Sequence, residues 1–375
     1  MDGPRTWLLL GDKRGDNAQV EAIALALGWP CERRFLQMRE PWTVAKPRVE
    51  ASLHHIDPDR SDPLRPPWPD LVLTIGRRPS MAALWVGEQA DRRPRLVLVG
   101  KPSGMADRFD LVISSAENQM PPLANLLPIS LPLMRVDRAA IEAAAKAWGP
   151  RLVDLPRPLV GFLIGGPTGP FAYDQSVVRR LLERAAAVAT AGGTPYLTTS
   201  RRTPAAIVAA LEQGLPAGAP LFRWQPDAAD NPYLGLLGLA DGFVVTGDSI
   251  SMMVEVVRLR RPLAIFELPT SAGGSLDRLR RSLARAVFEP AARSPAGSWQ
   301  RRLARALYAL GVIGYTRDFE AFHAMLFERG LAVRAGQALV PPSGEVPDDL
   351  SRVVARIRTL MGVAQAERPT VAATP

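Results

Sequence analysis

Polar residues follow an apolar run of this chain in a way that would suit a bound phosphate. The run 243–245 ends in Thr246-Gly247-Asp248-Ser249, and a helical pattern continues to residue 258. Asp248 is a favoured N-cap residue, and N–H groups at the start of a helix attract anions. Asp248, Ser251 and Glu255 form one polar stripe at helical spacing, which predicts serines near phosphate and Glu255 on a sugar diol. The solvent-facing side of an amphipathic helix gives the same pattern.

Other apolar runs also end in polar turns. Gly165 and Gly166 follow the run 159–164, and glycine lets the backbone approach a ligand closely. Arg201 and Arg202 follow the run 196–199, directly before a helix that begins with proline. Guanidinium groups beside a helix start are suited to a diphosphate. The turns contribute further polar residues, namely Ser200, Asn231 and Tyr233.

The first turn of the chain, GDKRGDNAQ at 11–19, offers a second kind of chemistry. Asp16 or Asp12 could act as a general base, with Asn17 and Gln19 orienting a substrate hydroxyl. A loop that only caps the following helix would have the same composition. Arg77 lies in the equivalent turn after the run 71–75.

Composition argues against several other kinds of site. Cys31 is the single cysteine, so one chain cannot build a disulfide or a cysteine-based metal centre. The three histidines are predicted to be a solvated loop pair, His54 and His55, and a packed helix residue, His323. A general base is therefore expected to be a carboxylate. Asp57-Pro58-Asp59 matches a DxD motif but lies in proline-rich sequence, and no metal site is predicted.

The net charge of +9 comes almost wholly from arginines, which are dispersed in pairs. Nucleic-acid binding is not expected, because the chain has no known nucleic-acid-binding motif. An anionic membrane surface or a phosphorylated substrate is compatible with the charge. No apolar run approaches 18 residues, so we expect a cytoplasmic protein, soluble or peripheral at the inner face of the cytoplasmic membrane.

Two series of apolar runs must position these turns. The first comprises 7–10, 34–37, 71–75, 96–99 and 111–114, and the second 159–164, 196–199, 221–224, 243–245 and 263–266. Helical patterns occur at 18–27, 80–89, 137–148, 174–191 and 249–258. The alternation predicts an α/β protein of two Rossmann-like, doubly wound domains facing a cleft, residues 1–150 and 158–345. A C-terminal helix and tail, 346–375, would follow, and amphipathic helices at 276–288 and 301–313 would pack on the domains or lie on an anionic membrane.

Five segments occur in an order that resembles a known family. LLGDKRGDNAQ, LIGGPTGP, TTSRRTP, DNPYLG and VVTGDSISMMVEV are similar to the Elm-type family named for plant mitochondrial fission, whose bacterial members are regarded as glycosyltransferases. The resemblance covers roughly residues 7 to 270 and implies a glycosyltransferase-B-like fold.

The resemblance implies transfer of a sugar from a nucleotide diphosphate donor to an envelope polysaccharide or lipid-linked acceptor, without a metal or other cofactor. Asp16 and Asp12 would be the catalytic candidates, with Asn17, Gln19 and Arg77 on the acceptor side. The implied donor-binding residues are Gly165, Gly166, Ser200, Arg201, Arg202, Asn231, Tyr233, Asp248, Ser249, Ser251 and Glu255. The alternatives are a non-catalytic nucleotide-binding or scaffold protein of the same fold and a nucleotide-sugar epimerase.

Overall fold

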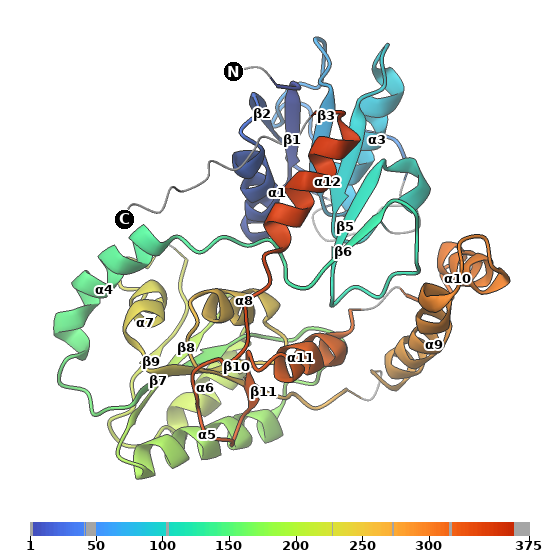
Figure 1. Cartoon of the computed structure of the whole chain (residues 1–375). Helices are drawn as coiled ribbons and strands as arrows, with labels where there is room; N and C mark the ends of the chain where they lie inside the picture. The colour runs from blue at the N-terminus through green and yellow to red at the C-terminus, as the bar shows by residue number, and fades with distance from the viewer. Residues whose placement is uncertain are drawn as a thin grey trace, which may run out of the picture. The chain divides into compact units, whose positions relative to one another are not determined.

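Two all-parallel sheets of six strands each form the framework of the protein, as the computed structural model in Figure 1 shows. The structure describes residues 3–40, 42, 50–102, 105–226, 228–271, 274–314 and 317–363. The first sheet has the strand order β2-β1-β3-β4-β5-β6. Its strands are β1 Thr6–Leu10, β2 Cys31–Phe35, β3 Leu71–Ile75, β4 Arg95–Val99, β5 Leu111–Ser115 and β6 Leu126–Ile129.

Alternate residues of β1 are buried on opposite faces of the first sheet. Leu8 and Leu10 pack in one core with side chains of α1, whereas Trp7 and Leu9 pack in another with side chains of α3. A strand covered on both faces is uniformly apolar, which is why this run does not alternate with polar residues. The first sheet is therefore doubly wound.

The second sheet has the strand order β12-β11-β10-β7-β8-β9. Its strands are β7 Leu159–Ile164, β8 Thr194–Thr199, β9 Leu221–Phe222, β10 Gly242–Thr246, β11 Leu263–Phe266 and β12 Val333–Arg334. Counted from β7, this is the Rossmann order 3-2-1-4-5-6 in reverse, and the order changes direction between β7 and β10. Ligands of open α/β sheets bind outside the carboxyl ends of the strands at such a switch point. The corresponding point of the first sheet lies between β1 and β3.

Most helices follow the strands as the apolar patterns predict, with ends shifted by a few residues. The helices are α1 Arg14–Leu27, α3 Arg77–Gln89, α4 Arg138–Leu152, α5 Gln175–Thr190, α6 Ala205–Gln213, α7 Tyr233–Leu239, α8 Ile250–Arg258, α9 Gly274–Arg293, α10 Trp299–Ala309, α11 Phe319–Glu328 and α12 Asp349–Leu360. Within the described residues, no helix combines the length and the apolar character needed to cross a membrane.

The chain divides into two units, each of which combines segments distant in sequence. The first unit is Met1–Leu133, Val287–Tyr315 and Asp348–Pro375, and the second is Met134–Ala286 and Thr316–Pro347. This division differs from the expected domains 1–150 and 158–345. Helix α4 belongs to the second unit, because Gly235 and Gly238 of α7 let the two helices pack closely; a Cβ on Gly235 would lie 2.6 Å from Trp148 Cγ.

The C-terminal part of the chain also differs from the separate segment, 346–375, that the sequence predicts. Helix α12 packs on the first unit beside α1, where Val353 and Ile357 are fully buried (Figure 1). The Asp349 carboxylate fastens the connection by accepting the N–H groups of Ser130 at 2.7 Å and Leu131 at 3.2 Å. The predicted frayed tail, 365–375, lies outside the described residues.

Candidate functional site

Three turns of the second unit meet at the switch point between β7 and β10. They are Gly165–Gly166 after β7, 200–203 after β8 and 247–249 after β10, and we call them the switch-point turns. The Gly165 N–H donates to Thr246 Oγ1 at 2.8 Å, and the Gly166 N–H donates to Asp248 Oδ2 at 3.0 Å. Thr203 Oγ1 donates to the Gly165 carbonyl at 2.5 Å. The sequence separates these turns by tens of residues, and the parallel sheet brings them together.

Asp248 lies at the centre of the switch-point turns. Its side chain has no exposed surface and accepts hydrogen bonds from Thr246 Oγ1 at 2.7 Å, from Gly166 N and from Arg202 Nη2 at 2.9 Å. The prediction that Asp248 caps the following helix is wrong. Ser249 occupies the N-cap position of α8, and its side chain makes no capping hydrogen bond. The carboxylate turns inward because it finds several hydrogen-bond donors there.

Arg202 links all three turns through its guanidinium group. Nη2 reaches both Asp248 and Ser249 Oγ, the latter at 3.2 Å, and Nη1 donates to the Gly166 carbonyl at 3.3 Å and to Thr168 Oγ1. The Arg202 side chain is nevertheless 41% exposed, so part of its cationic surface remains accessible. Its neighbour Arg201 is exposed on the same turn.

The two glycines of the first turn are needed for packing within the protein. A Cβ on Gly165 would lie 2.2 Å from Asp248 Oδ2, and a Cβ on Gly166 would lie 2.1 Å from the Arg202 carbonyl oxygen. The sequence interpretation assigned these glycines to the approach of a ligand. In the structure, the turns after β8 and β10 approach these glycines closely.

Glu255 and Tyr233 form a hydrogen-bonded pair on α8 and α7, with the Tyr233 hydroxyl donating to Glu255 Oε2. Burial raises the pKa of the Glu255 carboxyl, while the hydrogen bond from Tyr233 opposes this rise. Burial likewise raises the pKa of Tyr233 well above its usual value. The predicted polar stripe is therefore not uniform, because Asp248 is buried, Glu255 is partly buried and Ser251 is exposed. Asn231 is exposed and accepts the Tyr233 N–H at 3.0 Å.

Two residues beside the switch-point turns were not among the predicted site residues. Burial raises the pKa of Tyr173, with a further rise from the Asp248 charge. His323 of α11 is 5% exposed, and its Nε2 lies 2.9 Å from the Gly247 carbonyl oxygen, which identifies Nε2 as the donor. The prediction of a packed helix histidine is confirmed. Tyr173 follows the glycine-rich turn closely in sequence, but nothing in the sequence places His323 against Gly247.

We expect His323 to make the stability of the protein depend on pH. Burial lowers its pKa from 6.5 to about 4, so the unfolded chain takes up a proton before the folded chain does. Stability should therefore fall as the pH drops from 6.5 towards 4, by up to about 3 kcal/mol from this group. Urea unfolding of wild type and His323→Gln at pH 7, 6 and 5 measures the difference. Parallel stability curves for the two proteins would contradict the assignment.

The predicted residues of the first unit gather at its own switch point. A Cβ on Gly76, which has φ +81°, would lie 3.9 Å from Asp16 Oδ2, so the turns after β1 and β3 are adjacent. Asp12 is exposed, and Arg77 begins α3. Asn17 closes the first turn by binding Gly11 N at 3.1 Å and Gly11 O at 2.8 Å.

Gln19 of the same loop accepts the Leu133 N–H at 3.0 Å. The side chains of Asn17 and Gln19 therefore form hydrogen bonds with backbone groups of the protein. The sequence interpretation predicted that they would orient a substrate hydroxyl. The prediction that His54 and His55 form a solvated pair is wrong for His55. His55 is fully buried, with Nε2 3.0 Å from the Arg78 carbonyl oxygen, and burial lowers its pKa to about 4.

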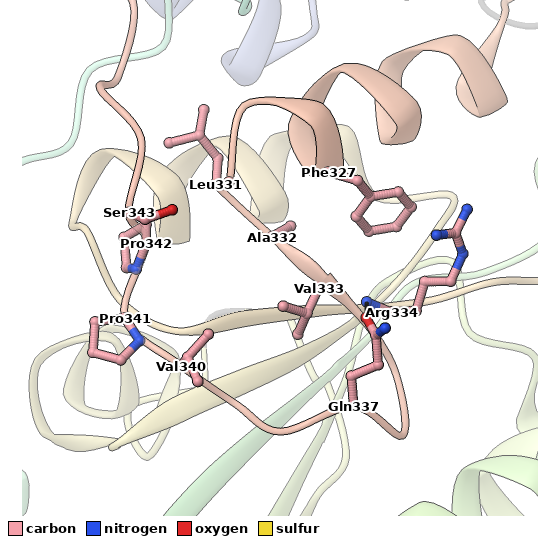
Figure 2. Close-up of a pocket in the computed structure, with 11 residues that line it drawn as sticks. Phe327, Leu331, Ala332, Val333, Arg334, Gln337, Val340, Pro341, Pro342 and Ser343 are labelled. Atoms are coloured by element: carbon pink, nitrogen blue, oxygen red, sulfur yellow. Dashed lines mark hydrogen bonds between the residues drawn. The ribbon is translucent and has the colours of Figure 1, made fainter.

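A cavity of about 370 Å³ lies at the β12 edge of the second sheet. Figure 2 shows Phe327, Arg334, Val340 and Pro341 among the residues that line it, and none of the predicted site residues does so. The Arg334 guanidinium lies 4.5 Å from the Phe327 ring centre and 3.4 Å from a Glu267 carboxylate oxygen. The protein itself therefore supplies an aromatic and an acidic partner to this guanidinium group.

Comparison with known proteins gives one family and several distant structures. A family model described as Mitochondrial fission ELM1 matches residues 14–307. Mitochondrial fission protein ELM1 of Arabidopsis thaliana is 26% identical over 219 residues, which are 52% of this chain and 51% of the plant protein. The match thus spans about half the length of that relative.

Solved structures with similar folds share little sequence with this chain. A glycosyl transferase family 9 protein from Veillonella parvula has a TM-score of 0.44 at 10% identity, covering 83% of this chain and 98% of its own. MurG of Acinetobacter baumannii has a TM-score of 0.43 at 11% identity, with 95% and 99% covered. A UDP-GlcNAc 2-epimerase of Methanocaldococcus jannaschii, solved with UDP-GlcNAc and UDP, has a TM-score of 0.40 at 12% identity, with 81% and 99% covered. Similarity of this degree does not assign an activity.

Proposed function

This chain belongs to the mitochondrial fission ELM1 family, and from the geometry of its second unit we propose that it is a nucleotide-sugar transferase. The donor would be a nucleotide diphosphate sugar bound by the second unit. The acceptor would be a hydroxyl of an envelope polysaccharide or a lipid-linked saccharide. No metal or other cofactor would be required.

One observation carries the proposal: a half-exposed arginine and a helix start without a side-chain cap meet at a Rossmann switch point. Among the described residues, the N-cap side chain of α8 makes no hydrogen bond to the first turn of that helix. The backbone N–H groups there are suited to phosphate oxygens. Arg202, whose side chain is 41% exposed, would add a positive charge beside them.

Glu255 is our candidate for the ribose. Its Oε2 accepts the Tyr233 hydroxyl, which fixes the carboxyl group and leaves Oε1 to accept from a sugar hydroxyl. Ser249 and Ser251 would lie on the phosphate side of this carboxyl, at the start of α8. Two further predicted donor ligands, Arg201 and Asn231, are exposed and would have only peripheral roles.

In the proposed reaction, the bond between the anomeric carbon and the diphosphate oxygen breaks as the acceptor oxygen bonds to that carbon. The acceptor proton passes to a carboxylate, for which Asp16 is our candidate and Asp12 the second choice. Arg202 and the start of α8 would stabilise the charge that develops on the leaving diphosphate.

A non-catalytic nucleotide-binding protein is the second candidate, and one observation favours it. The side chains of Asn17 and Gln19 are engaged with the Gly11 and Leu133 backbone, so the first turn offers few polar groups for an acceptor. Release of nucleoside diphosphate from a nucleotide-sugar, lost in Asp16→Asn, would separate transfer from binding alone.

We expect at least one nucleoside diphosphate to raise the melting temperature of the protein. A ligand at 100 times its dissociation constant stabilises a folded protein by about 2.7 kcal/mol, which thermal denaturation detects. Glu255→Gln should remove the advantage of the nucleotide over inorganic diphosphate, because only the nucleotide has a ribose. If no nucleoside diphosphate or nucleotide-sugar raises the melting temperature of the wild-type protein, the proposal is contradicted.

A further inference from the structure

Helices α9 and α10 carry apolar stripes that are exposed on the surface of the protein. Along α9 the exposed residues are Leu276, Leu279 and Leu283, with exposed fractions of 67%, 56% and 47%. They lie three and four residues apart, so they share one face of the helix. Soluble proteins seldom expose a contiguous row of large apolar side chains without a use for it.

A second stripe runs along α10 within the first unit. Trp299 and Leu303 are 69% and 42% exposed, and Leu310, at the end of the helix, is 76% exposed. The opposite face of α10 is anchored, since Tyr308 is buried, packs on the Phe288 ring at 6.3 Å and donates to Met120 Sδ at 3.2 Å. The helix is therefore held in place with its apolar stripe outward.

Positive charge borders both stripes. Residues 274–314 hold eight arginines and two acidic residues, so this segment carries +6 of the net charge of +9. Some of these arginines are engaged, as Arg281 is with Glu320 and Arg285 with Asp318. Arg280, Arg302 and Arg305 are exposed, and their side chains make no ion pair or hydrogen bond within the part of the chain that the structure describes. At helical spacing, Arg280 flanks the α9 stripe and Arg302 flanks the α10 stripe.

We propose that the apolar face of α9, which belongs to the second unit, and that of α10, which belongs to the first, bind the surface of an anionic lipid bilayer. Leucines and a tryptophan on one face with arginines at its border are what an interfacial helix requires: the apolar side chains enter the headgroup boundary, and the arginines reach the lipid phosphates. The charge selects this occupant, because a purely apolar partner would leave the unpaired guanidinium groups of Arg280 and Arg302 at its edge. The inference concerns α9 and α10 (orange in Figure 1) and is independent of the nucleotide-sugar proposal.

Vesicle cosedimentation of the 375-residue chain tests this inference. We expect binding to vesicles of phosphatidylcholine with phosphatidylglycerol at low salt, release at high salt, and weak binding to phosphatidylcholine alone. Arg280→Gln with Arg302→Gln should weaken binding about fivefold for each arginine removed. Leu303→Glu with Leu310→Glu should abolish binding, since a carboxylate would have to enter the headgroup boundary.

Leu25→Glu on α1 is the matched control, because Leu25 is 66% exposed but lies outside both stripes. It should bind vesicles like the wild type, and circular dichroism should show that all variants are folded. The inference is overturned if the wild-type protein does not sediment with anionic vesicles. It is also overturned if Leu303→Glu with Leu310→Glu leaves binding unchanged, or if these substitutions instead dissociate a dimer of this chain.

Discussion

Asp248→Ala is expected to lower the free energy of unfolding by about 3 kcal/mol, the cost of leaving buried hydrogen-bond donors without their acceptor. The carboxylate has no exposed surface and accepts from Gly166 N, Thr246 Oγ1 and Arg202 Nη2. Alanine would leave the buried Gly166 N–H without its acceptor and would remove one of the bonds that hold Arg202. Urea unfolding followed by circular dichroism measures the loss.

Asp230→Ala is the matched control for this substitution. Asp230 also pairs with an arginine of the second unit, Arg151, at 3.1 Å, but the two side chains are 78% and 53% exposed. An exposed pair contributes little, so we expect a change within about 0.5 kcal/mol. Equal effects of Asp230→Ala and Asp248→Ala would show that Asp248 does not hold the switch-point turns together.

Gly166→Ala is expected to destabilise the protein by at least about 3 kcal/mol, at the upper end of overpacking effects. The added Cβ would lie 2.1 Å from the Arg202 carbonyl oxygen and 2.4 Å from its carbonyl carbon. Both atoms belong to backbone, which cannot move aside as a flexible side chain can. The turn after β7 and the turn after β8 would have to separate, and Arg202 would lose its hydrogen bond to the Gly166 carbonyl. The midpoint of urea unfolding reports this loss.

Gly149→Ala provides the contrast within the same unit. Gly149 lies in α4, and a Cβ there would meet no atom within 4 Å. Alanine is the better helix former by up to about 1 kcal/mol, whereas Pro150, the next residue, disfavours a helical residue that carries a Cβ, so we expect a change within about 1 kcal/mol. If Gly166→Ala behaved in the same way, the close packing of the switch-point turns would be refuted.

The framework of the fold could be predicted because buried parallel strands are uniformly apolar. β3, β7 and β11 begin and end at the predicted residues, since each run is bounded by polar or turn-forming sequence. Two strands were missed for physical reasons. β6 contains Pro128 and is only partly buried, and β12 has two residues at the edge of its sheet.

The candidate site could be predicted only in outline. The turns themselves were recognisable, because each follows an apolar run and is rich in glycine, serine or arginine. The direction of the Asp248 side chain was not, since it depends on Gly166, 82 residues away in sequence. For the same reason the sequence could not distinguish Arg202, which joins the three turns, from Arg201 beside it, which is exposed.

Calorimetric titration of a nucleoside diphosphate into the wild-type protein, Arg202→Gln and Arg201→Gln tests the central claim most directly. Because a hydrogen bond to a charged group contributes about 1.5–3 kcal/mol, Arg202→Gln should weaken binding more than tenfold. Arg201→Gln, on the same turn but without a contact to the other two turns in the described residues, should stay within about twofold of wild type. Tight binding that is indifferent to Arg202, or no binding by the wild-type protein, would contradict a nucleotide diphosphate site at the switch-point turns.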